Sequence, residues 1–256
     1  MPAWMSELTS DGFLGGRLRI AQPRGGFRSG ADAVMLAAAC PAQAGQAVLD
    51  LGCGAGVAGL CLGWRVPGLH LVGLEQQAAY ADLATRNAAA NGIAMQVVTG
   101  DLARPPAQLR SQIFDHVIAN PPYFLGGTPA PDGGRAIARR EETPLSVWID
   151  SALRRLRPRG MVTLIQRADR LDAMLASLSG RAGSVVILPV AGRAGREAGR
   201  VIVQARKGGR GPLRLLAPFV MHREPAHPGD REDLTQATSA VLREGAPLTA
   251  LFAKVS

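Results

Sequence analysis

A short apolar strand that opens into a glycine loop decides the fold of this chain: Val48-Leu49-Asp50-Leu51-Gly52-Cys53-Gly54-Ala55-Gly56. Its apolar residues predict a buried strand, and an apolar helix is expected to follow from Val57 to Val66. Glycines permit a tight turn and let a ligand approach the backbone closely. The first turn of the helix leaves N–H groups that would face this ligand. The stretch therefore predicts a strand, loop and helix unit of an α/β protein that binds a small molecule.

Two further strands end in acidic residues. A strand over residues 70–74 is followed by Glu75, and a strand over residues 96–99 runs into Gly100 and Asp101. A carboxylate about 20 residues beyond a glycine loop, at the end of a strand, is placed to bind the two hydroxyls of a ribose. Each acidic residue taken alone would more simply be a helix N-cap or part of a solvated loop. In this order, and together with Asp50, they predict a nucleoside pocket.

The glycine loop also allows an alternative reading. Residues 54–59 match the pattern G-x-G-x-x-G of dinucleotide-binding proteins, although such a match alone is weak. The charge of Asp50, directly before the loop, suits an ammonium or sulfonium group better than a pyrophosphate. In addition, the tetrapeptide Asn120-Pro121-Pro122-Tyr123 has no role in hydride transfer. Both features count against a dinucleotide.

This tetrapeptide follows an apolar run over residues 114–119, which predicts another buried strand. Prolines lack a backbone donor, so the chain must leave the sheet stiffly at the carboxyl end of that strand. Open α/β sheets bind their ligands at this edge. The turn would present the side-chain oxygen of Asn120, the carbonyl of Pro121 and the ring of Tyr123. These groups suit a flat molecule with an NH2 group, which stacks on the ring and donates hydrogen bonds to the two oxygens.

The rest of the pattern alternates helices and strands. We expect residues 1–15 to be frayed, residues 17–28 to form a hairpin around Pro23-Arg24-Gly25, and a helix to run from Asp32, its N-cap, to Cys40. Further helices are expected over residues 77–91, 145–156, 169–178 and 231–242. Pro158-Arg159-Gly160 is expected to stop the helix over residues 145–156. Further strands are expected over residues 161–166, 184–189, 200–205 and 213–220. This alternation predicts a Rossmann-like α/β fold with a mostly parallel sheet, helices on both faces and an antiparallel last strand. We expect a single domain over residues 1–256, with a hairpin and helix in 1–45, a cofactor-binding core in 46–205 and a C-terminal extension in 206–256.

The order Asp50-x-Gly52-x-Gly54-x-Gly56, Glu75, Asp101 and Asn120-Pro121-Pro122-Tyr123 resembles that of a class I S-adenosylmethionine-dependent methyltransferase. In these enzymes the last motif is the version that methylates amines, on adenine and on glutamine amides. The segments over residues 17–22 and 26–37 are similar to those of the bacterial tRNA adenine-N6 methyltransferases that act on valine tRNA. That family typically has a threonine before the aspartate, where this chain has Ala31. The resemblance covers roughly residues 16–255 and implies a seven-stranded methyltransferase sheet.

The resemblance also implies a role for each motif. Glu75 would bind the ribose of the cofactor, Asp101 its adenine amine, and Asp50 with the glycine loop its methionine end. Asn120 and the Pro121 carbonyl would draw the N–H bonds of the acceptor amine out of the ring plane, which localises the nitrogen lone pair toward the methyl group. Positioning supplies much of the barrier reduction in such a transfer, so no dedicated general base is expected. The implied residues are catalytic Asn120, Pro121 and Tyr123; cofactor-binding Asp50, Gly52, Gly54, Gly56, Glu75, Asp101, Asn120, Gly30 and Asp32; and substrate-binding Pro122, Phe124, Arg135, Arg139 and Arg140.

The chain has 256 residues and a net charge of +9, and its 29 basic residues are arginines except for Lys207 and Lys254. An arginine-rich composition also arises from a GC-rich genome, so the charge alone does not establish a polyanionic partner. For a single arginine a solvated surface is the better interpretation, whereas for clusters beside a pocket that would accept a base, phosphate binding is at least as good an interpretation. The later of these clusters comprises Arg193, Arg196, Arg200, Arg206, Lys207, Arg210 and Arg214.

Several classes of protein are disfavoured. No apolar run reaches 18 residues and the N-terminus lacks the features of a signal peptide, so we expect no membrane span and a cytoplasmic protein. Cys40, Cys53 and Cys61 lack the spacing of a metal site or of a disulfide framework. The four histidines are expected to be structural or solvated. The resemblance then implies S-adenosyl-L-methionine as the cofactor, no metal, an RNA partner, and a monomer or homodimer.

Three classes of function stay open. The first is an RNA adenine-amine methyltransferase, for which the resemblance implies tRNA near the anticodon. The second is a protein glutamine-N5 methyltransferase acting on release factors, although such enzymes usually carry a longer helical N-terminal domain than the 46 residues that precede Ala47. The third is a non-catalytic RNA-binding module, against which the intact motifs argue. DNA also stays open as an acceptor.

Overall fold

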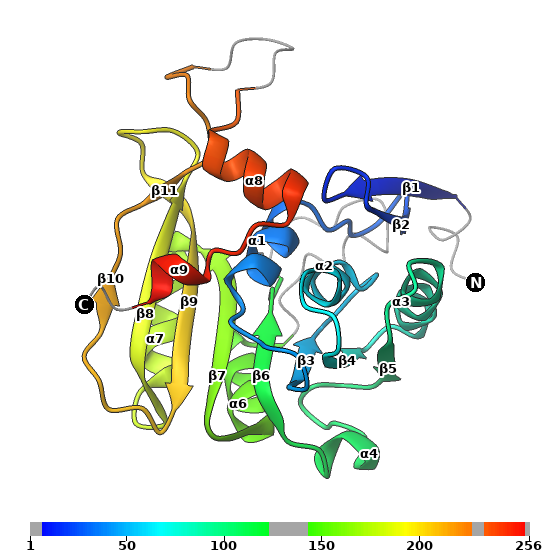
Figure 1. The fold of residues 1–256 in the computed structure, drawn as a ribbon. Helices are drawn as coiled ribbons and strands as arrows, with labels where there is room; N and C mark the ends of the chain where they lie inside the picture. The colour runs from blue at the N-terminus through cyan, green and yellow to red at the C-terminus, as the bar shows by residue number, and fades with distance from the viewer. Residues whose placement is uncertain (1–6, 123–142, 227–232, 254–256) are drawn as a thin grey trace.

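The computed structural model describes residues 7–122, 143–226 and 233–253. In these ranges a nine-stranded sheet runs through the molecule in the order β10-β8-β9-β7-β6-β3-β4-β5, with β11 paired to β8 (Figure 1). Its strands are β3 (Ala47–Leu51), β4 (His70–Glu75), β5 (Met95–Thr99), β6 (Phe114–Ala119), β7 (Leu156–Arg167), β8 (Ala182–Ala191), β9 (Ala198–Lys207), β10 (Arg214–Leu215) and β11 (Phe219–Val220).

Seven of these strands form the predicted sheet. β3 is parallel to β4 and β6, β4 to β5, and β6 to β7. β9 is antiparallel to both β7 and β8, which confirms the prediction of a mostly parallel sheet with an antiparallel last strand. β10 and β11 lie parallel to β8 and extend the sheet beyond the seven. The single strand predicted over residues 213–220 is thus two short ones, separated by a segment that contains Pro218, which cannot donate to a ladder.

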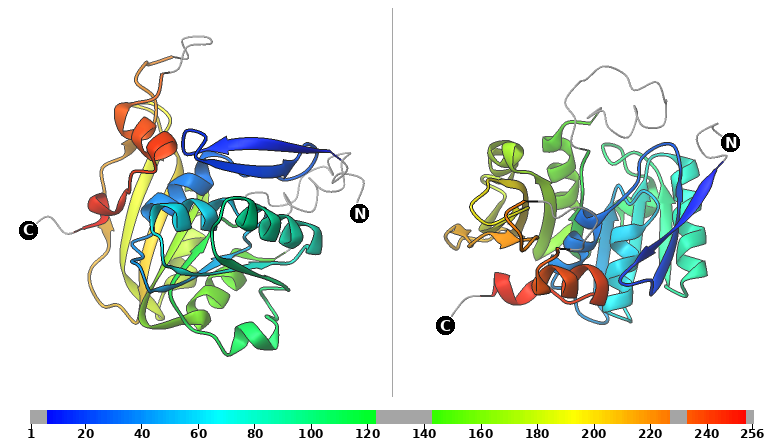
Figure 2. Two further views of the ribbon diagram at one scale, coloured as in Figure 1. Left: turned by 45° about the vertical axis from the view of Figure 1, so that its right-hand side comes forward. Right: turned by 90° about the horizontal axis from the view of Figure 1, so that it is seen from above.

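Helices cover both faces of the sheet (Figure 2). α1 (Ala31–Ala39), α2 (Val57–Arg65) and α3 (Ala78–Ala90) pack on one face, and α4 (Ala107–Arg110), α6 (Leu145–Arg155) and α7 (Leu171–Leu178) pack on the other. Alternate residues of β3 divide between the two cores, since Val48 packs with α1 and α2 while Leu49 and Leu51 pack with α6. α8 (Gln236–Glu244) and α9 (Thr249–Phe252) contact α1. None of the helices in the described ranges has the length and apolar character that crossing a membrane requires.

The N-terminal hairpin differs from the prediction. β1 (Leu8–Phe13) pairs antiparallel with β2 (Leu18–Pro23), so the hairpin includes residues expected to be frayed and turns before β2, not at Pro23-Arg24-Gly25. Gly15 and Gly16 both have positive φ in this turn, a conformation that glycine adopts without steric cost. Gly15-Gly16 and Pro23-Arg24-Gly25 are both turn signals. The turn forms at the earlier one because residues 18–23 can then form β2, in which Leu18 and Ile20 are buried.

Three helix boundaries also differ. Gly30, not Asp32, is the N-cap of α1, and Asp32 lies in the first turn, where its carboxylate accepts a hydrogen bond from Arg200 Nε. α6 ends at Arg155, and the predicted stop at Pro158-Arg159-Gly160 lies inside β7, at a shift in its register with β6. The helix predicted from residue 231 begins at Gln236 because Thr235 caps it with a side-chain hydrogen bond.

Two asparagines of α3 fix β2 to the rest of the domain. Asn87 is buried; its Nδ2 donates to the carbonyls of Ala21 and Ala55, and its Oδ1 accepts from Ala21 N. Asn91 bonds the backbone N–H and carbonyl of Arg19 in the same way. Because Ala55 belongs to the glycine loop, Asn87 connects the hairpin directly to that loop.

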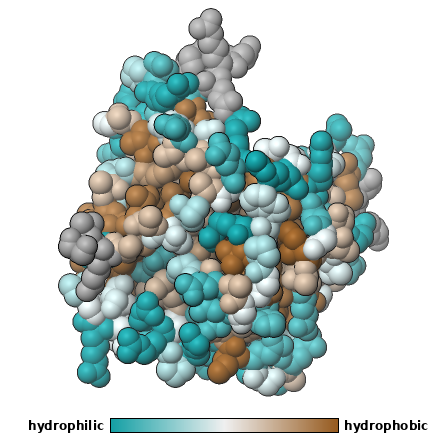
Figure 3. Space-filling view, in the orientation of Figure 1, coloured by the Kyte–Doolittle hydropathy of each residue, from teal (hydrophilic) through white to brown (hydrophobic). Residues whose placement is uncertain are grey.

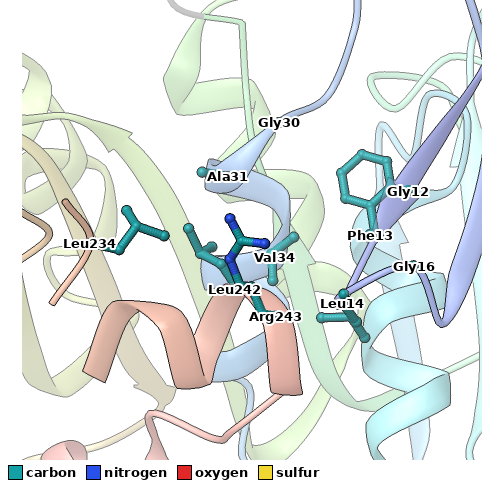
Figure 4. A pocket seen from close by; sticks show the side chains of 11 residues that line it. Gly12, Phe13, Leu14, Gly16, Gly30, Ala31, Val34, Leu234, Leu242 and Arg243 are labelled. Carbon is teal, nitrogen blue, oxygen red and sulfur yellow. The ribbon is translucent and has the colours of Figure 1, made fainter. Parts of the chain in front are cut away.

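The turn of the hairpin also meets the end of α8, and a groove of about 410 Å³ lies between them over α1 (Figure 4). Arg17 Nη1 donates to the carbonyl of Arg243 at 2.6 Å and to that of Leu14 at 3.0 Å. The guanidinium of Arg17 also lies over the ring of Trp64, 5.6 Å from its centroid, an arrangement that favours the cation. Arg17 therefore joins the hairpin turn to the end of α8.

Two neighbouring glycines test this junction. A Cβ at Gly15 would lie 2.8 Å from the carbonyl oxygen of Arg243, whereas a Cβ at Gly16 would meet no described atom within 4 Å; both residues have positive φ. We expect Gly16→Ala to lower the free energy of unfolding by about 1 kcal/mol and Gly15→Ala by about 2–3 kcal/mol, because only the latter adds a collision to the backbone strain. Urea denaturation measures both, and equal losses would show that α8 does not confine the turn.

Candidate active site

The carboxyl ends of β5, β4, β3 and β6 lie next to one another at one edge of the sheet, here called the carboxyl edge. They place Asp101, Glu75, Asp50 and Asn120 along it in that order. Leu51 pairs with Ala119, so the residues that follow, Gly52 and Asn120, leave neighbouring strands side by side. Adjacent strands lie about 4.8 Å apart, so the four groups span about 15 Å, which is the scale of a nucleoside. The structure thus brings together the acidic residues and the asparagine that the sequence analysis selected.

The glycine loop has positive φ at Gly52, Gly54 and Gly56. Gly52 N and Cys53 N both donate to the carbonyl of Leu74, at 2.8 and 3.0 Å, which draws the loop onto the end of β4. A Cβ at Gly52 would lie 2.4 Å from the ring of Trp148, so packing requires glycine there. At Gly54 the nearest described atom would be Phe27 Cε1 at 3.9 Å, so this face of the loop is open to a ligand.

Glu75 holds the loop from the end of β4. Its Oε2 accepts from Gly54 N and its Oε1 from Gln77 N, both at 2.9 Å. The side chain is buried, and this burial raises the pKa of Glu75 against the opposing effect of the backbone N–H groups of Gln77 and Gly54. A carboxylate has about four acceptor positions, so Glu75 can still accept hydrogen bonds from a hydroxyl group.

Asp50 lies beneath the loop at the end of β3. Its Oδ2 accepts from Gly59 N in α2 at 2.9 Å, and the residue is 3% exposed. Burial raises the pKa of Asp50 to about 7; the N–H of Gly59 opposes this rise, and the charge of Glu75 adds to it. A cation bound above the loop would favour the ionised form of this carboxyl group.

The other predicted cofactor residues lie in more open surroundings. Asp101 is half-exposed, and its Oδ1 accepts from Ala103 N at 2.8 Å. A Cβ at Gly30 would meet no described atom within 4 Å, whereas the carboxylate of Asp32 pairs with Arg200 at 3.0 Å. Gly30 follows a segment that passes the glycine loop, where Phe27 approaches Gly54.

Asn120 and Pro121 follow β6 directly. Asn120 is half-buried, Pro121 is buried and Pro122 is half-buried. The carbonyl of Pro121 accepts a hydrogen bond from Gln166 Nε2 at 3.3 Å. Because a carbonyl oxygen has two lone pairs, it can accept from a second donor. Five of the predicted residues, Tyr123, Phe124, Arg135, Arg139 and Arg140, lie outside the described residues.

Three polar residues that the sequence did not predict support this edge. Asn87 holds the carbonyl of Ala55 in the glycine loop, and Tyr80 Oη donates to the carbonyl of Phe27. Gln166, 2% exposed at the end of β7, holds Pro121 with its amide nitrogen and accepts from Arg167 N with its oxygen. A polar residue within an apolar stretch is the sequence signal that could have identified such residues. Asn87, which lies within an alanine-rich helix, is an example.

The histidines and cysteines lie in structural settings. His116 is buried against Gln46, and burial lowers the pKa of its ring to about 4. His222 pairs with Asp233 at 2.6 Å, His70 is exposed, and His227 lies outside the described residues. The three cysteines are buried and free, and burial raises the pKa of each thiol. In the part of the chain that the structure describes, no three His, Cys, Asp or Glu side chains form a group that could hold a metal ion.

This arrangement has a definite chemical capacity. Carboxylates accept hydrogen bonds from hydroxyl and amine groups, and their charge favours a cationic ligand. The open face at Gly54 admits a ligand next to the backbone. The carboxyl edge therefore fits a nucleoside with a positively charged substituent, next to an amide and a carbonyl oxygen that can accept from an amine.

Comparison with known proteins agrees with this geometry. The family model described as "Methyltransferase small domain" matches residues 29–174. A tRNA1(Val) (adenine(37)-N6)-methyltransferase from Porphyromonas gingivalis is 36% identical over 173 residues, which are 64% of this chain and 68% of the relative. One with the same name from Dickeya chrysanthemi is 31% identical over 215 residues, 82% of this chain and 85% of the relative.

Solved structures show the same fold. A predicted O-methyltransferase from Agrobacterium tumefaciens superimposes with a TM-score of 0.69 at 26% identity, covering 84% of this chain and 97% of that one. A 16S rRNA methyltransferase from T. thermophilus, in complex with AdoMet and guanosine, gives a TM-score of 0.54 at 22% identity, covering 78% of this chain and 50% of that one.

The titration of Asp50 predicts how stability changes with pH. The unfolded chain loses the Asp50 proton near pH 4 and the folded chain near pH 7, so the folded state binds more protons in between. The contribution of Asp50 to stability therefore falls as pH rises through this window, by at most about 1.4 kcal/mol per pH unit. We expect the free energy of unfolding of Asp50→Asn, measured relative to that of the wild type, to rise by about 2–4 kcal/mol between pH 4.5 and pH 7.5. Urea denaturation at each pH measures this difference.

Asp172→Asn, at an exposed position of α7, is the matched control for the loss of one carboxylate. If the free energies of unfolding of Asp50→Asn and the wild type changed in parallel over this pH range, the raised pKa of Asp50 would be contradicted.

Proposed function

Because this chain belongs to the methyltransferase small domain family and is an S-adenosylmethionine-dependent methyltransferase, we propose that it methylates the N6 amine of an adenine in tRNA. The observation that carries the proposal is the position of Asn120 and the Pro121 carbonyl beside the glycine loop, in a chain with relatives named for this reaction at 31–36% identity. We propose the substrate of those relatives, adenine 37 of a valine tRNA, encountered in the cytoplasm.

The residues of the carboxyl edge fit the cofactor. Its face at Gly54 is open, and Glu75 and Asp101 retain acceptor positions. When bound, S-adenosylmethionine supplies an electrophilic methyl group on a positively charged sulfur. We assign Glu75 to the ribose hydroxyls and Asp101 to the adenine amine of the cofactor. We assign Asp50 and the loop from Gly52 to Gly56 to its methionine end, with Gly30, Asp32 and Asn120 completing the set.

The acceptor amine is a weak nucleophile because its lone pair is delocalised into the adenine ring. Asn120 Oδ1 and the Pro121 carbonyl would each accept one N–H of this amine and hold the nitrogen with its lone pair toward the methyl group. The lone pair would then face the electrophilic methyl group that the bound cofactor would supply, and solvent would take the amine proton that is released. Gln166 is a positioning residue in this scheme, because it holds the carbonyl of Pro121. We assign Tyr123 to stacking on the target base, and Pro122, Phe124, Arg135, Arg139 and Arg140 to the RNA.

A second acceptor, the glutamine amide of a release factor, presents the same NH2 chemistry to Asn120 and Pro121. The relatives named for methylation of tRNA, at 31–36% identity, favour a nucleic acid acceptor. A target base in an anticodon loop is accessible without opening a duplex, which keeps the cost of extruding it low.

The assignment is tested by transfer of tritium from labelled S-adenosylmethionine to bulk tRNA from cells that lack the gene. We expect label in tRNA, recovered as N6-methyladenosine. We expect Asn120→Ala to lower kcat by about 100-fold, because it removes one of the two groups that orient the amine. Calorimetric titration with S-adenosylmethionine serves as the control that the variant still binds its cofactor. Label in recombinant release factor and none in tRNA would move the activity to protein.

Gln166 offers a separate test of orientation. We expect Gln166→Leu to lower kcat roughly tenfold with little change in the dissociation constant of the cofactor, because the Pro121 carbonyl loses its donor. Gln204→Leu is the matched control: Gln204 is also buried, but its Nε2 donates to the carbonyl of Ala39, away from the site. Both variants should lose similar stability. An equal loss of kcat in the two would reduce Gln166 to a structural role.

A further inference from the structure

A cluster of positive charge lies at the edge of the sheet opposite the active site. β9 runs antiparallel to its neighbours, so the basic group predicted from residues 193 to 214 is not one surface. Arg193, Arg196 and Arg200 precede or begin β9 at the carboxyl edge, whereas Arg206 and Lys207 end it at the opposite edge. Figure 3 shows hydrophilic residues gathered at the lower end of the molecule, where β9 ends in Figure 1.

Other elements bring further arginines to this opposite edge. The end of α6, the start of β7 and the residue before β8 all reach it. We call the set the amino-edge cluster: Arg154, Arg155, Arg157, Arg181, Arg206 and Lys207.

Backbone carbonyls hold three of these side chains in place. Lys207 Nζ donates to the carbonyl of Leu156 at 2.7 Å, and Arg206 Nη1 to that of Arg159 at 2.8 Å. Arg155 Nη1 donates to the carbonyls of Leu109 and Arg110. An arginine has five N–H donors, so these bonds fix the guanidinium groups while leaving other donors for a ligand.

The charge of the cluster is poorly balanced. Within the described ranges its ion pairs involve two carboxylates: Asp150, shared by Arg154 and Arg181, and Asp115, which pairs with Arg157. The cations also repel one another. Desolvation lowers the pKa of Lys207, and the charges of Arg181 and Arg155 lower it further. The cations of the cluster therefore repel one another in the free protein, and a bound anion would reduce this repulsion.

The carboxyl edge has the opposite character. There Arg167 pairs with Asp169, Arg193 with Asp233 and Arg200 with Asp32. Three arginines of the carboxyl edge are thus paired with carboxylates, whereas Arg155, Arg206 and Lys207 on the far side of the sheet donate to backbone carbonyls. A surface that attracts a polyanion is expected where the positive charge is unbalanced.

We propose that the amino-edge cluster binds backbone phosphates of the substrate tRNA at a distance from the target nucleotide. This inference rests on the proposed function. The ten-residue strand β9 runs from one edge to the other, a distance of about 33 Å, which an anticodon loop alone does not span. The tRNA would present its target base at the carboxyl edge and lay a neighbouring helical arm along the side of the domain, onto the cluster.

The test compares two RNAs on one enzyme. Full-length tRNA and a synthetic anticodon stem-loop with the same target adenine are methylated by the wild type and by Arg154→Gln/Arg181→Gln. Both changed side chains are well exposed, at 69% and 43%, so the fold should tolerate their loss. Arg19→Gln/Arg86→Gln, at exposed positions in the N-terminal third of the chain, removes the same charge elsewhere.

We expect the cluster variant to raise the KM for tRNA about fivefold or more. We expect it to lower the slope of log KM against log salt concentration by about 1–2, because each lost phosphate contact lowers this slope by somewhat less than 1. Its kcat and its activity on the stem-loop should match those of the wild type, and the control variant should match the wild type on both RNAs. Arg157→Gln, alone, should shift the KM for tRNA in the same direction.

Equal activity of the cluster and control variants on tRNA would overturn the inference. So would an equal loss on tRNA and stem-loop, because the cluster would then act through the fold. If the wild type methylates neither RNA, it is the proposed function that fails. The inference about the amino-edge cluster is then tested by measuring the binding of labelled tRNA to the two variants by fluorescence anisotropy. Weaker tRNA binding by the cluster variant than by the control would then support it, and equal binding would refute it.

Discussion

The carboxylate of Glu75 is the contact on which the ligand-binding edge depends. It joins the end of β4 to the glycine loop through Gly54 N and to the start of the next segment through Gln77 N. Hydrogen bonds to a charged acceptor contribute about 1.5–3 kcal/mol each, and the loop has no repeating structure of its own to replace them. The same side chain is the proposed partner of the ribose hydroxyls. One buried carboxylate therefore shapes the loop and is also the group that we propose for the ligand, and its burial raises its pKa.

Residues with a strong local signal were predicted well. β3, β4 and β6 are apolar runs bounded by acidic residues or prolines, and β6 was predicted with its observed bounds, Phe114–Ala119. The hairpin was misplaced because Gly15-Gly16 and Pro23-Arg24-Gly25 are equally good turn signals, and only the burial of Leu18 and Ile20 against the domain decides between them. The hydrogen-bond partners of Asn87 and Gln166 and the pairing of Asp32 with Arg200 could not be predicted, since each partner lies far away in the chain.

The arginines show the same limit more sharply. A run of basic residues reads as one surface along the sequence, but a ten-residue antiparallel strand carries its two ends to opposite sides of the molecule. Arg193 and Arg200 at one end pair with carboxylates, whereas Arg206 and Lys207 at the other end donate to backbone carbonyls. Basic residues that are neighbours in the sequence are thus divided in the fold between two surfaces, and the one where they join other arginines is the one we propose for a polyanion.

The bond from Arg17 to the carbonyl of Arg243 joins residues 226 positions apart. During synthesis the hairpin therefore emerges from the ribosome long before the helix that anchors its turn. Contacts of such long sequence separation form late and slow the folding of a domain. Before α8 is made, Asn87 and Asn91 can already hold the hairpin against α3, but its turn still lacks the bond from Arg17. A chain that stops short of α8 would therefore have a less firmly held hairpin turn.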